Sequence, residues 1–388
     1  MNNEKTLRAV IAIDSFKGSL SSLCAGEAAA DGIRAVFEDA ETAVSPLADG
    51  GEGPVAAIVS ATGGELMRVT VTGPLGKPVT AEYGYIKERD TAVIEMSAAA
   101  GITLLAPEER NPLLTTTYGV GEIILDAIKK GCRRFLIGIG GSATNDGGVG
   151  MLSALGFSFL DKDGNEIPRG AGGLAFLASI KTDGAHPLLK ECEFRIASDV
   201  ENTLCGERGC SAVFGPQKGA TPDMVRDMDT WLSRYAALTK AETGRDMRDA
   251  KGAGAAGGIG FAFLSYLNSR LQSGIELVIA ETGLEEKIRT ADVVVTGEGR
   301  LDGQSVMGKA PVGVARLAKK YGKPVIAFAG CVTEDAVLCN EYGIDAFFPI
   351  LRGVVTLDEA MANDAAAQNL KATAEQAFRL LRYVKIEK

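Results

Sequence analysis

The sequence predicts an α/β protein with two α/β domains and mainly parallel sheets. The chain has 388 residues, which is more than one core of ordinary size usually takes. Short β-branched runs alternate with stretches of helical spacing, as in parallel strands that are joined by helices. Glycine is abundant, with 48 residues, well above its usual share of roughly 7%. The glycines gather where apolar runs end, which indicates loops where the backbone comes close to another group.

Strands and helices alternate from the N-terminus until a hairpin interrupts the pattern. A β-branched run that ends at Asp14 is typical of a buried strand, and Pro54 is typical of the first turn of a helix. The expected elements are a strand over 7–13, a helix over 20–37, a strand over 42–47, a helix over 54–61 and paired strands over 65–71 and 79–86.

The middle of the chain continues with strands and helices, and the C-terminal part returns to strict alternation. The middle is expected to hold strands over 91–96, 134–139, 157–160 and 194–197, and helices over 115–130, 150–155, 222–243 and 255–267. The C-terminal part is expected to hold strands over 292–296, 324–329 and 346–350, and helices over 308–321 and 357–384.

Because both ends of the chain show the same strand and helix pattern, we expect them to fold together. The first predicted domain is discontinuous and Rossmann-like, and it comprises residues 1–75 plus 290–388. The second is an inserted α/β domain over 76–289 that carries the glycine-rich loop. Two contiguous halves are the alternative.

Composition excludes several classes of protein. The net charge of −9 and the lack of a basic tract argue against a surface for nucleic acid or an anionic membrane. No apolar run reaches the roughly 18 residues of a membrane span, and the N-terminus lacks the pattern of a signal peptide. Seven cysteines without a C-x-x-C pair suggest neither disulfides nor a zinc site. We therefore expect a cytoplasmic protein; the sequence does not indicate its oligomeric state.

A glycine-rich run, GIGGSATNDGGVG, covers residues 138–150 between an expected strand and an expected helix. Backbone amides at such a helix start can point at an anion, and small residues leave room for it. The predicted phosphate-binding residues in this run are Gly140, Gly141, Ser142, Thr144 and Asn145. Two alternatives stay open: a tight turn without a ligand, and dinucleotide binding.

The dinucleotide alternative has support and an objection. Gly138, Gly140 and Ala143 match the G-x-G-x-x-A spacing, and Asp161 follows at roughly the expected distance. However, residues 145–148 read Asn-Asp-Gly-Gly, which are poor residues for the first turns of the required helix.

Two other glycine strings are weaker. Residues 252–257 spell G-x-G-x-x-G, but no strand is expected before them. Residues 303–309 spell a P-loop, except that Ala310 stands where a Ser or Thr should hold magnesium. We do not expect a P-loop nucleotidase, although Lys309 remains a candidate for binding phosphate.

Charged residues follow several expected strands, where open α/β sheets bind ligands. Asp14 and Lys17 follow the first strand, and Asp49 follows the second. Asp49 and Glu52 also have the spacing of a capping box, so helix capping alone would explain them. Three more charged residues, Glu298, Arg300 and Asp302, follow the strand that begins near residue 292.

Two further candidates lie in the middle of the chain. Asp199 directly follows an apolar strand, so its carboxylate could accept a proton or bind Mg²⁺. Lys218 stands between Pro216 and Gly219 and would present a point charge to a phosphate. The single histidine, His186, lies in a polar loop and is not expected to build a catalytic triad. Phosphate cradles, lysines and scattered carboxylates without histidine favour phosphoryl transfer.

Together these strings resemble the bacterial type-1 glycerate kinase family over essentially the whole chain. The matching segments are DSFKGS (14–19), PLADGGEG (46–53), GIGGSATNDGG (138–148), FGPQKGA (214–220), GAGAAGG (252–258) and TGEGRLD (296–302). Ile13, Pro54 and Thr203 depart from the residues usual in that family. The resemblance implies a kinase that uses ATP and Mg²⁺ to phosphorylate D-glycerate, at the 2-hydroxyl in preference to the 3-hydroxyl.

On this basis we expect each candidate residue to have a role. Asp199 would take the hydroxyl proton, and Lys218 would be the second catalytic residue. Glycerate would be bound by Asp14, Lys17, Asp49 and Arg300, and phosphates by the loop over 140–145 and Lys309, while Glu298 and Asp302 would hold Mg²⁺. A nicotinamide-dependent oxidoreductase of small hydroxy acids is the alternative from another class.

Overall fold

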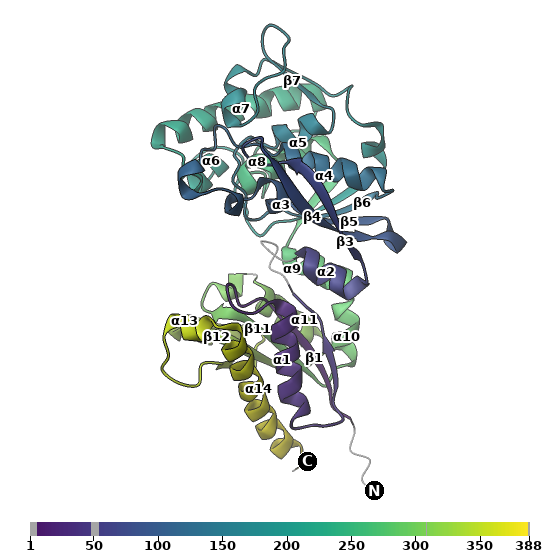
Figure 1. The fold of residues 1–388 in the computed structure, drawn as a ribbon, viewed down its shortest axis with the longest axis vertical. Coiled ribbons are helices and arrows are strands. Elements are labelled where there is room, and N and C mark those ends of the chain that lie inside the picture. Colours follow the sequence, from purple (N-terminus) through teal and green to yellow (C-terminus); the bar gives the residue numbers. More distant parts are fainter. Residues whose placement is uncertain (1–5, 48–53, 308, 387–388) are drawn as a thin grey trace. The chain divides into compact units, whose positions relative to one another are not determined.

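The computed structural model describes residues 6–47, 54–307 and 309–386 and divides into two compact units (Figure 1). Unit 1 comprises Met1–Asp49, Ser60–Thr62 and Ile275–Lys388, and unit 2 comprises Gly50–Val59 and Gly63–Gly274. Unit 1 is thus built from both ends of the chain. Each unit has its own sheet with helices packed on it, so the predicted α/β class is confirmed.

Within the described residues, the sheet of unit 1 has five strands, and all neighbours run parallel. The strands are β1 (Arg8–Ile13), β2 (Glu41–Val44), β11 (Val293–Leu301), β12 (Val325–Val332) and β13 (Ala346–Pro349). Their spatial order is β13-β12-β11-β1-β2. From β1 the chain passes to β2 on one side, whereas β11, β12 and β13 continue on the other. Open α/β sheets bind ligands at such a switch point, here between β1 and β11.

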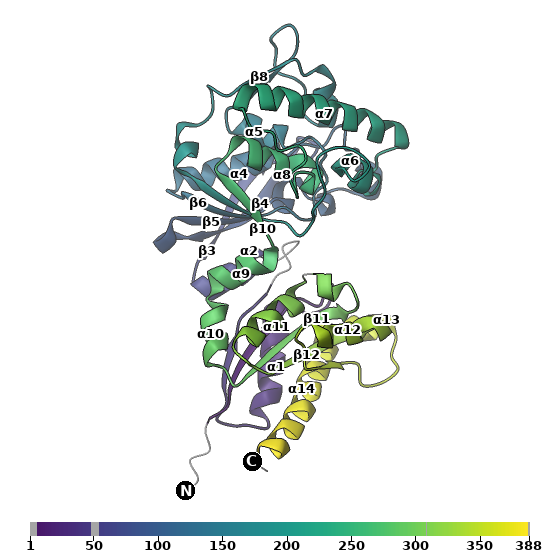
Figure 2. The same cartoon turned by 180° about the vertical axis from the view of Figure 1, so that it is seen from behind.

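Helices cover both faces of this sheet. On one face, α1 (Ser22–Arg34) and α14 (Asn363–Ile386) pack against each other and share a core with β1, β11 and β12 (Figure 1). On the other, α10 (Leu284–Thr290) and α11 (Ala310–Lys320) contact β1 (Figure 2). Gly32 lets α1 approach α14 closely, because a Cβ there would collide with the backbone oxygen of Lys371. The remaining α-helices described in unit 1 are α12 (Leu338–Glu341) and α13 (Leu357–Met361).

The described part of unit 2 contains a six-stranded mixed sheet with the order β10-β9-β6-β5-β4-β3. The strands β10, β9, β6 and β5 run parallel to one another, whereas β4 runs antiparallel to both of its neighbours, β5 and β3. The strands are β3 (Glu65–Thr72), β4 (Pro78–Ile86), β5 (Thr91–Glu95), β6 (Arg134–Gly138), β9 (Glu193–Ala197) and β10 (Ser269–Gln272), and β7 (Ser158–Leu160) pairs with β8 (Ser179–Lys181) apart from them. Phe135 of β6 stacks on Phe194 of β9 with ring centroids 4.8 Å apart.

The helices of unit 2 share one hydrophobic core with this sheet. They are α3 (Ser97–Ala100), α4 (Tyr118–Lys129), α5 (Val149–Ala154), α6 (Cys210–Phe214), α7 (Pro222–Thr243) and α8 (Ala255–Tyr266), while α2 (Pro54–Thr62) and α9 (Gly274–Thr282) cross the boundary between the units. No helix within the described residues combines the length and apolar character that crossing a membrane requires.

The structure differs from the sequence-based expectations at several places. The predicted boundaries at 75 and 290 do not match the division above: β3 pairs with β4 in unit 2, and α10 packs in unit 1. The strand expected to end at residue 296 continues to Leu301, because β12 pairs with it beyond Gly297. Only glycine fits at 297, since a Cβ would collide with the backbone oxygen of Phe328. Finally, the short elements β8, β10, α3, α6, α9, α10 and α12 were not predicted from the sequence.

The helix expected over 255–267 contains a left-handed turn. Ala256, Gly257 and Gly258 all have positive φ angles. This turn packs directly against the glycine-rich run. The Gly147 N–H donates to the backbone oxygen of Gly257 at 2.9 Å. A Cβ on Gly257 would collide with the backbone oxygen of Thr144. Two glycine strings are therefore used to pack two loops together.

Replacing Gly257 by Ala should destabilise unit 2 strongly, because it adds a collision with backbone to the strain of a left-handed residue. Gly244→Ala is the matched control, since Gly244 has φ +73° and nothing within 4 Å of the added Cβ. We expect a loss of about 1 kcal/mol for the control and about 2 kcal/mol more for Gly257→Ala. Urea unfolding followed by fluorescence of Trp231, the single tryptophan, measures unit 2; equal losses would contradict this account.

Candidate functional site

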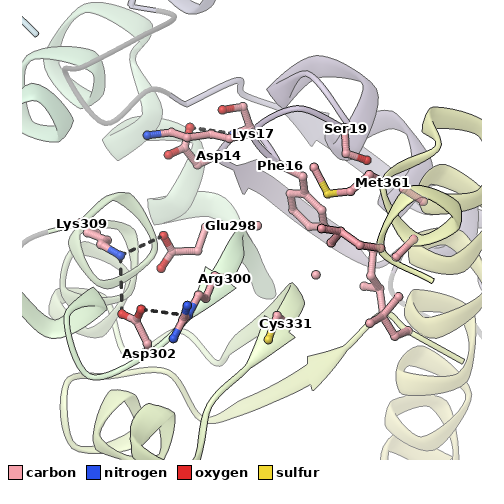
Figure 3. Close-up of a pocket in the computed structure, with 18 residues that line it drawn as sticks. Asp14, Phe16, Lys17, Ser19, Glu298, Arg300, Asp302, Lys309, Cys331 and Met361 are labelled. Carbon is pink, nitrogen blue, oxygen red and sulfur yellow. Dashed lines mark hydrogen bonds and ion pairs between the residues drawn. The ribbon is translucent and has the colours of Figure 1, made fainter. Parts of the chain in front are cut away.

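A pocket of about 390 Å³ opens in unit 1 at the carboxyl edge of its sheet (Figure 3). Most of the lining lies at or after the ends of four strands: residues 14–17 follow β1, residues 298–300 lie in β11 and Asp302 follows it, residues 330–331 lie in β12, and residues 350–351 follow β13. The remaining lining residues belong to α13, the start of α14, the β1–α1 connection and the segment before α11. The pocket therefore lies at the switch point between β1 and β11.

One end of the pocket is charged and holds six of the residues predicted from sequence. They are Asp14, Lys17, Glu298, Arg300, Asp302 and Lys309. Lys309 Nζ lies 3.8 Å from Glu298 Oε2 and 3.5 Å from Asp302 Oδ1. Arg300 Nε lies 3.3 Å from the other carboxylate oxygen of Asp302 (Figure 3). Three carboxylates and three cations thus share one end of one cavity, which suits the binding of a charged ligand.

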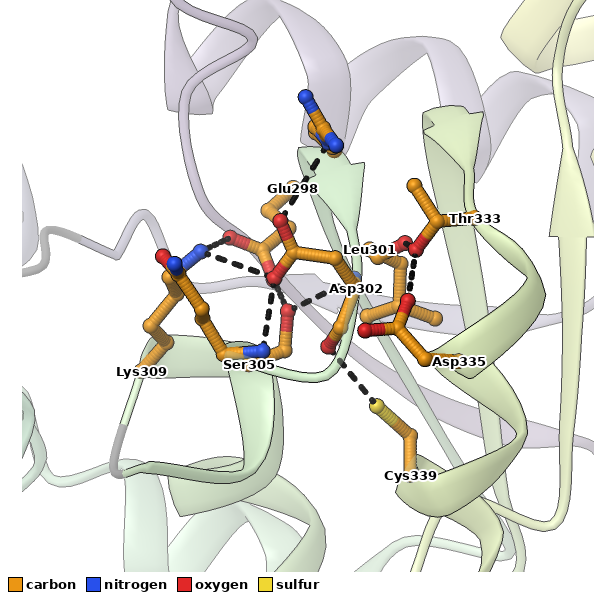
Figure 4. Close-up of polar contacts among 10 residues, drawn as sticks. Glu298, Leu301, Asp302, Ser305, Lys309, Thr333, Asp335 and Cys339 are labelled. Atoms are coloured by element: carbon orange, nitrogen blue, oxygen red, sulfur yellow. Dashed lines mark hydrogen bonds and ion pairs between the residues drawn. The ribbon is translucent and has the colours of Figure 1, made fainter.

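The turn after β11 holds two of these carboxylates in place. Ser305 Oγ donates a hydrogen bond to Glu298 Oε1 at 2.5 Å and accepts one from the Asp302 N–H at 3.2 Å (Figure 4). The N–H of Gln304 donates to Asp302 Oδ1 at 3.0 Å. Residues of the segment whose sequence resembles a P-loop therefore orient the carboxylates of Glu298 and Asp302 in this structure. Ser305 is a site residue that sequence reasoning missed.

A neighbouring carboxylate supports the same turn. Asp335 accepts a hydrogen bond from the Thr333 hydroxyl, which lowers the pKa of Asp335, and the amide of Gly303 and the charge of Arg300 act in the same direction. A Cβ on Gly303 would lie 2.5 Å from Asp335 Oδ2. Glycine at 303 thus lets the turn approach Asp335 closely.

Asp14 continues the register of β1 beyond the strand. Its N–H donates to the backbone oxygen of Gly297 at 2.8 Å, and one of its carboxylate oxygens accepts the N–H of Ser15 at 2.7 Å. Asp14 is buried, whereas Lys17 is exposed. Asp49, predicted beside them, lies outside the described residues.

The charged end offers oxygen ligands of the kind that Mg²⁺ prefers. Mg²⁺ is commonly bound by one or two carboxylates together with phosphate oxygens of a substrate. Glu298 and Asp302 already share one cation, the Lys309 ammonium, so the two residues fit such an ion. Among the described residues, no group of three or more His, Cys, Asp or Glu side chains is placed to hold a metal by itself.

The other end of the pocket is apolar, and sequence reasoning missed it. It is lined by Phe16, Ile350, Leu351, Leu357, Met361 and Ala366. In Figure 3, Phe16 and Met361 lie on the opposite side of the pocket from Lys309 and Asp302. For Leu351 and Leu357 the sequence does contain a signal. Both belong to a mainly apolar segment that directly follows the last strand, and ligands bind after the strands of an open α/β sheet.

In unit 2, the start of α5 does not have free amides for an anion. Asp146, which is buried, accepts the N–H groups of Thr117 at 2.8 Å, Gly148 at 3.1 Å and Gly150 at 3.3 Å. Burial raises the pKa of Asp146, and these hydrogen bonds oppose the shift. The Met151 N–H donates to the Thr117 hydroxyl. The helix start that the sequence assigned to an anion therefore binds the chain's own carboxylate.

The other residues of the glycine-rich loop differ in exposure. Gly141 is exposed and Gly140 is half-buried, whereas Ser142, Thr144 and Asn145 are buried. The amide nitrogen of Asn145 donates to the Ser211 hydroxyl at 2.8 Å. In this structure, only Gly140, Gly141 and the edge of Ser142 present the predicted phosphate site to solvent.

Lys218 lies in the interior of unit 2, with 2% of its surface exposed. Its Nζ donates to Ser142 Oγ at 2.8 Å and to the backbone oxygen of Thr144 at 2.6 Å. Loss of hydration lowers the pKa of Lys218 to about 8, although Cys210 and Asp146 oppose the shift. Lys218 thus ties two residues of the glycine-rich loop together from inside.

Asp199 lies in the loop after β9 and is exposed. Its Oδ1 accepts the N–H of Gly274 at the start of α9, at 3.1 Å. It belongs to unit 2, as do Lys218 and the glycine-rich loop, whereas the charged pocket belongs to unit 1. The predicted residues therefore form two groups, one in each unit.

An open parallel sheet with a half-charged, half-apolar pocket at its switch point defines an α/β enzyme that acts on a small anionic ligand. Comparison with known proteins identifies which one. The chain belongs to the glycerate kinase family, whose model matches residues 9–382. It is 48% identical to a glycerate kinase of Haemophilus influenzae over 97% of this chain and 99% of the relative.

Two further relatives agree. The chain is 48% identical to the glycerate 2-kinase of Escherichia coli K12, over 95% of this chain and 98% of the relative. A crystal structure of a protein described as glycerate kinase 2 from Salmonella typhimurium LT2 matches with a TM-score of 0.90 and 45% identity, covering 98% and 99% of the two chains. The chain is therefore an enzyme with glycerate kinase activity, and the oxidoreductase alternative has no support from these relatives.

The buried lysine gives unit 2 a dependence on pH. Because its pKa is lowered from 10.5 to about 8, the unfolded chain binds the Lys218 proton more tightly than the folded one. Stability should rise with pH between about 8 and 10.5, as the cost of a buried charge disappears. From pH 7 to pH 10, the free energy of unfolding of the wild type should gain about 2 kcal/mol relative to Lys218→Met.

Urea unfolding at both pH values, followed by Trp231 fluorescence, measures this difference in unit 2. Lys190→Met, which removes an exposed lysine of the same unit, controls for the loss of one positive charge. A difference between wild type and Lys218→Met that stays constant with pH would show that Lys218 is not desolvated as described.

Proposed function

We propose that this enzyme transfers the γ-phosphoryl group of ATP to the 2-hydroxyl of D-glycerate, with Mg²⁺, and that the charged end of the unit 1 pocket binds the phosphates and the metal ion. The observation that carries the proposal is the placement of six charged side chains at the switch point of the parallel sheet. The similarity to a glycerate 2-kinase supports the choice of hydroxyl.

The cations of the pocket suit the negative groups of both substrates. Lys17 and Lys309 are compact charges for the phosphates, and Arg300 can bind a carboxylate with two parallel hydrogen bonds. Arg300 is well exposed, with 64% of its side chain accessible, so its fork is open to a ligand. Positioning and neutralisation of charge are most of what phosphoryl transfer requires.

Glu298 and Asp302 are the proposed ligands of Mg²⁺. Bound there, the ion would neutralise charge on the phosphate oxygens. With Mg²⁺ bound, the Lys309 ammonium would contact phosphate instead of Glu298 and Asp302. The reason is that the metal ion and the ammonium would compete for the same two carboxylates. Ser305 keeps Glu298 oriented through its hydroxyl.

The reaction also needs a base for the hydroxyl proton. The glycerate oxygen attacks the γ-phosphorus, the bond from that phosphorus to the bridging oxygen of ADP breaks, and the proton passes to a carboxylate. We assign this role to the carboxylate of Asp199. Asp199 is exposed in the loop after β9, and a hydrogen bond from the Gly274 N–H orients its carboxylate. Lys218 is assigned a positioning role, since its Nζ contacts Ser142 and Thr144.

Incubation of the purified protein with ATP, Mg²⁺ and D-glycerate should yield ADP and 2-phosphoglycerate. Proton-coupled ³¹P NMR distinguishes the products, because a phosphate on the 2-carbon couples to one proton and a phosphate on the 3-carbon couples to two. A doublet is expected. A triplet would instead assign the 3-hydroxyl, and the absence of ADP formation would contradict ATP as the donor.

Asp199→Asn should reduce kcat by about 100-fold or more, because general-base catalysis typically contributes that much. The KM for ATP should stay near that of the wild type, since the substitution keeps size and hydrogen bonding. Glu201→Gln, in the same loop and paired with the exposed Lys251, is the matched control and should keep wild-type kcat. A kcat unchanged by Asp199→Asn would remove this residue from the base role.

A further inference from the structure

We propose that the apolar end of the unit 1 pocket binds the base and ribose of the nucleotide, with its phosphates at the charged end. The inference rests on the proposed use of ATP. It assigns the nucleotide to residues that follow β1 and β13 and to residues of α13, and therefore to unit 1 instead of the glycine-rich loop of unit 2.

The apolar end is a built surface on a rigid floor. Phe16 is 4% exposed and is fixed by backbone hydrogen bonds with Leu20 on both sides of its turn. Gly330 of β12 lies under it, since a Cβ there would be 3.7 Å from Phe16 Cδ2. The buried Ile350 extends this floor beyond β13.

The same end of the pocket also has large apolar side chains that are open to solvent. Leu357 of α13 is 76% exposed and Leu351 is 40% exposed, and both line the pocket. Met361, one turn further along α13, also lines the pocket. Exposed apolar side chains around a cavity commonly mark a groove for a ligand. A ligand that covers them must have an apolar face.

Between the two substrates, the nucleotide fits this chemistry and glycerate does not. A purine base is planar and can place its faces against Phe16, Leu357 and Met361. Glycerate is a short acid with hydroxyl groups and no apolar face, so it would leave the apolar end in contact with water. The volume of about 390 Å³ also lies in the range of sites for ligands of nucleotide size.

The charges and the topology agree with this placement. Lys17 and Lys309 lie at the other end of the same pocket, where the phosphates of a nucleotide bound by its base would lie. The switch point of an open α/β sheet is the usual place for a nucleotide. In unit 2, by contrast, the amides at the start of α5 are engaged with Asp146 and Thr117.

Binding of ADP to the full chain, measured by isothermal titration calorimetry, tests the proposal without turnover. Leu357→Ser and Met361→Ser should each weaken ADP binding about five- to tenfold, because each removes apolar contact with the base. Both should raise the KM for ATP similarly and change the KM for glycerate less than about twofold. Leu380→Ser is the matched control: Leu380 is a helical leucine of unit 1 with 64% exposure, away from the pocket, and should bind ADP as the wild type does.

A second probe separates the base from the phosphates. Adenosine, which has no phosphate, should compete with ADP in the wild type and compete at least fivefold less well in Leu357→Ser. Circular dichroism melting of each variant establishes that it is folded.

Two results would overturn the proposal: wild-type affinity for ADP in both pocket variants, or a raised KM for glycerate with unchanged binding of ADP. If the variants lose ADP affinity but the wild type does not phosphorylate glycerate, the proposed function fails and the nucleotide site stands.

Discussion

The parallel pairing of β1 with β11 is the interaction on which the rest of the structure depends. It joins residues 9–13 to residues 293–297, so the N-terminal and C-terminal parts of the chain form one sheet, and unit 2 is inserted between them. The same pairing continues as a hydrogen bond from the Asp14 N–H to Gly297. It therefore brings Asp14 beside Glu298 and creates the switch point at which the pocket opens.

Glycine serves different physical needs in the two units. In unit 2, Gly147, Gly148, Gly257 and Gly258 adopt left-handed conformations and pack two loops into contact. In unit 1, Gly297, Gly299 and Gly330 let strands β11 and β12 and the Phe16 turn approach one another. A string of glycines in a sequence is thus compatible with a ligand cradle and with close packing of backbone, and only the partners of the amides distinguish the two.

The charged residues of the two units differ in burial and in their partners. Asp146 and Lys218 are buried in unit 2, and each makes its hydrogen bonds within the chain. In unit 1, Lys309 and Arg300 pair with carboxylates while they remain partly exposed. Partly exposed pairs can exchange partners at little cost, because solvent already compensates their charge. The unit 1 group is therefore suited to binding a ligand, whereas Asp146 and Lys218 of unit 2 hold the glycine-rich loop in place.

The sequence by itself determined the α/β class, the approximate place of most strands, the family, and the charged residues that follow the strands of unit 1. These follow from local patterns, since periodicity and strand ends depend on neighbouring residues. Tertiary structure decided which strand ends meet, so Asp14 and Lys309 share one pocket although they are far apart in sequence. It also decided that Asp146 occupies the amides of the glycine-rich loop and that Phe16, Leu357 and Met361 line one cavity. Such burial and pairing depend on segments that only the folded chain brings together, and no local pattern encodes them.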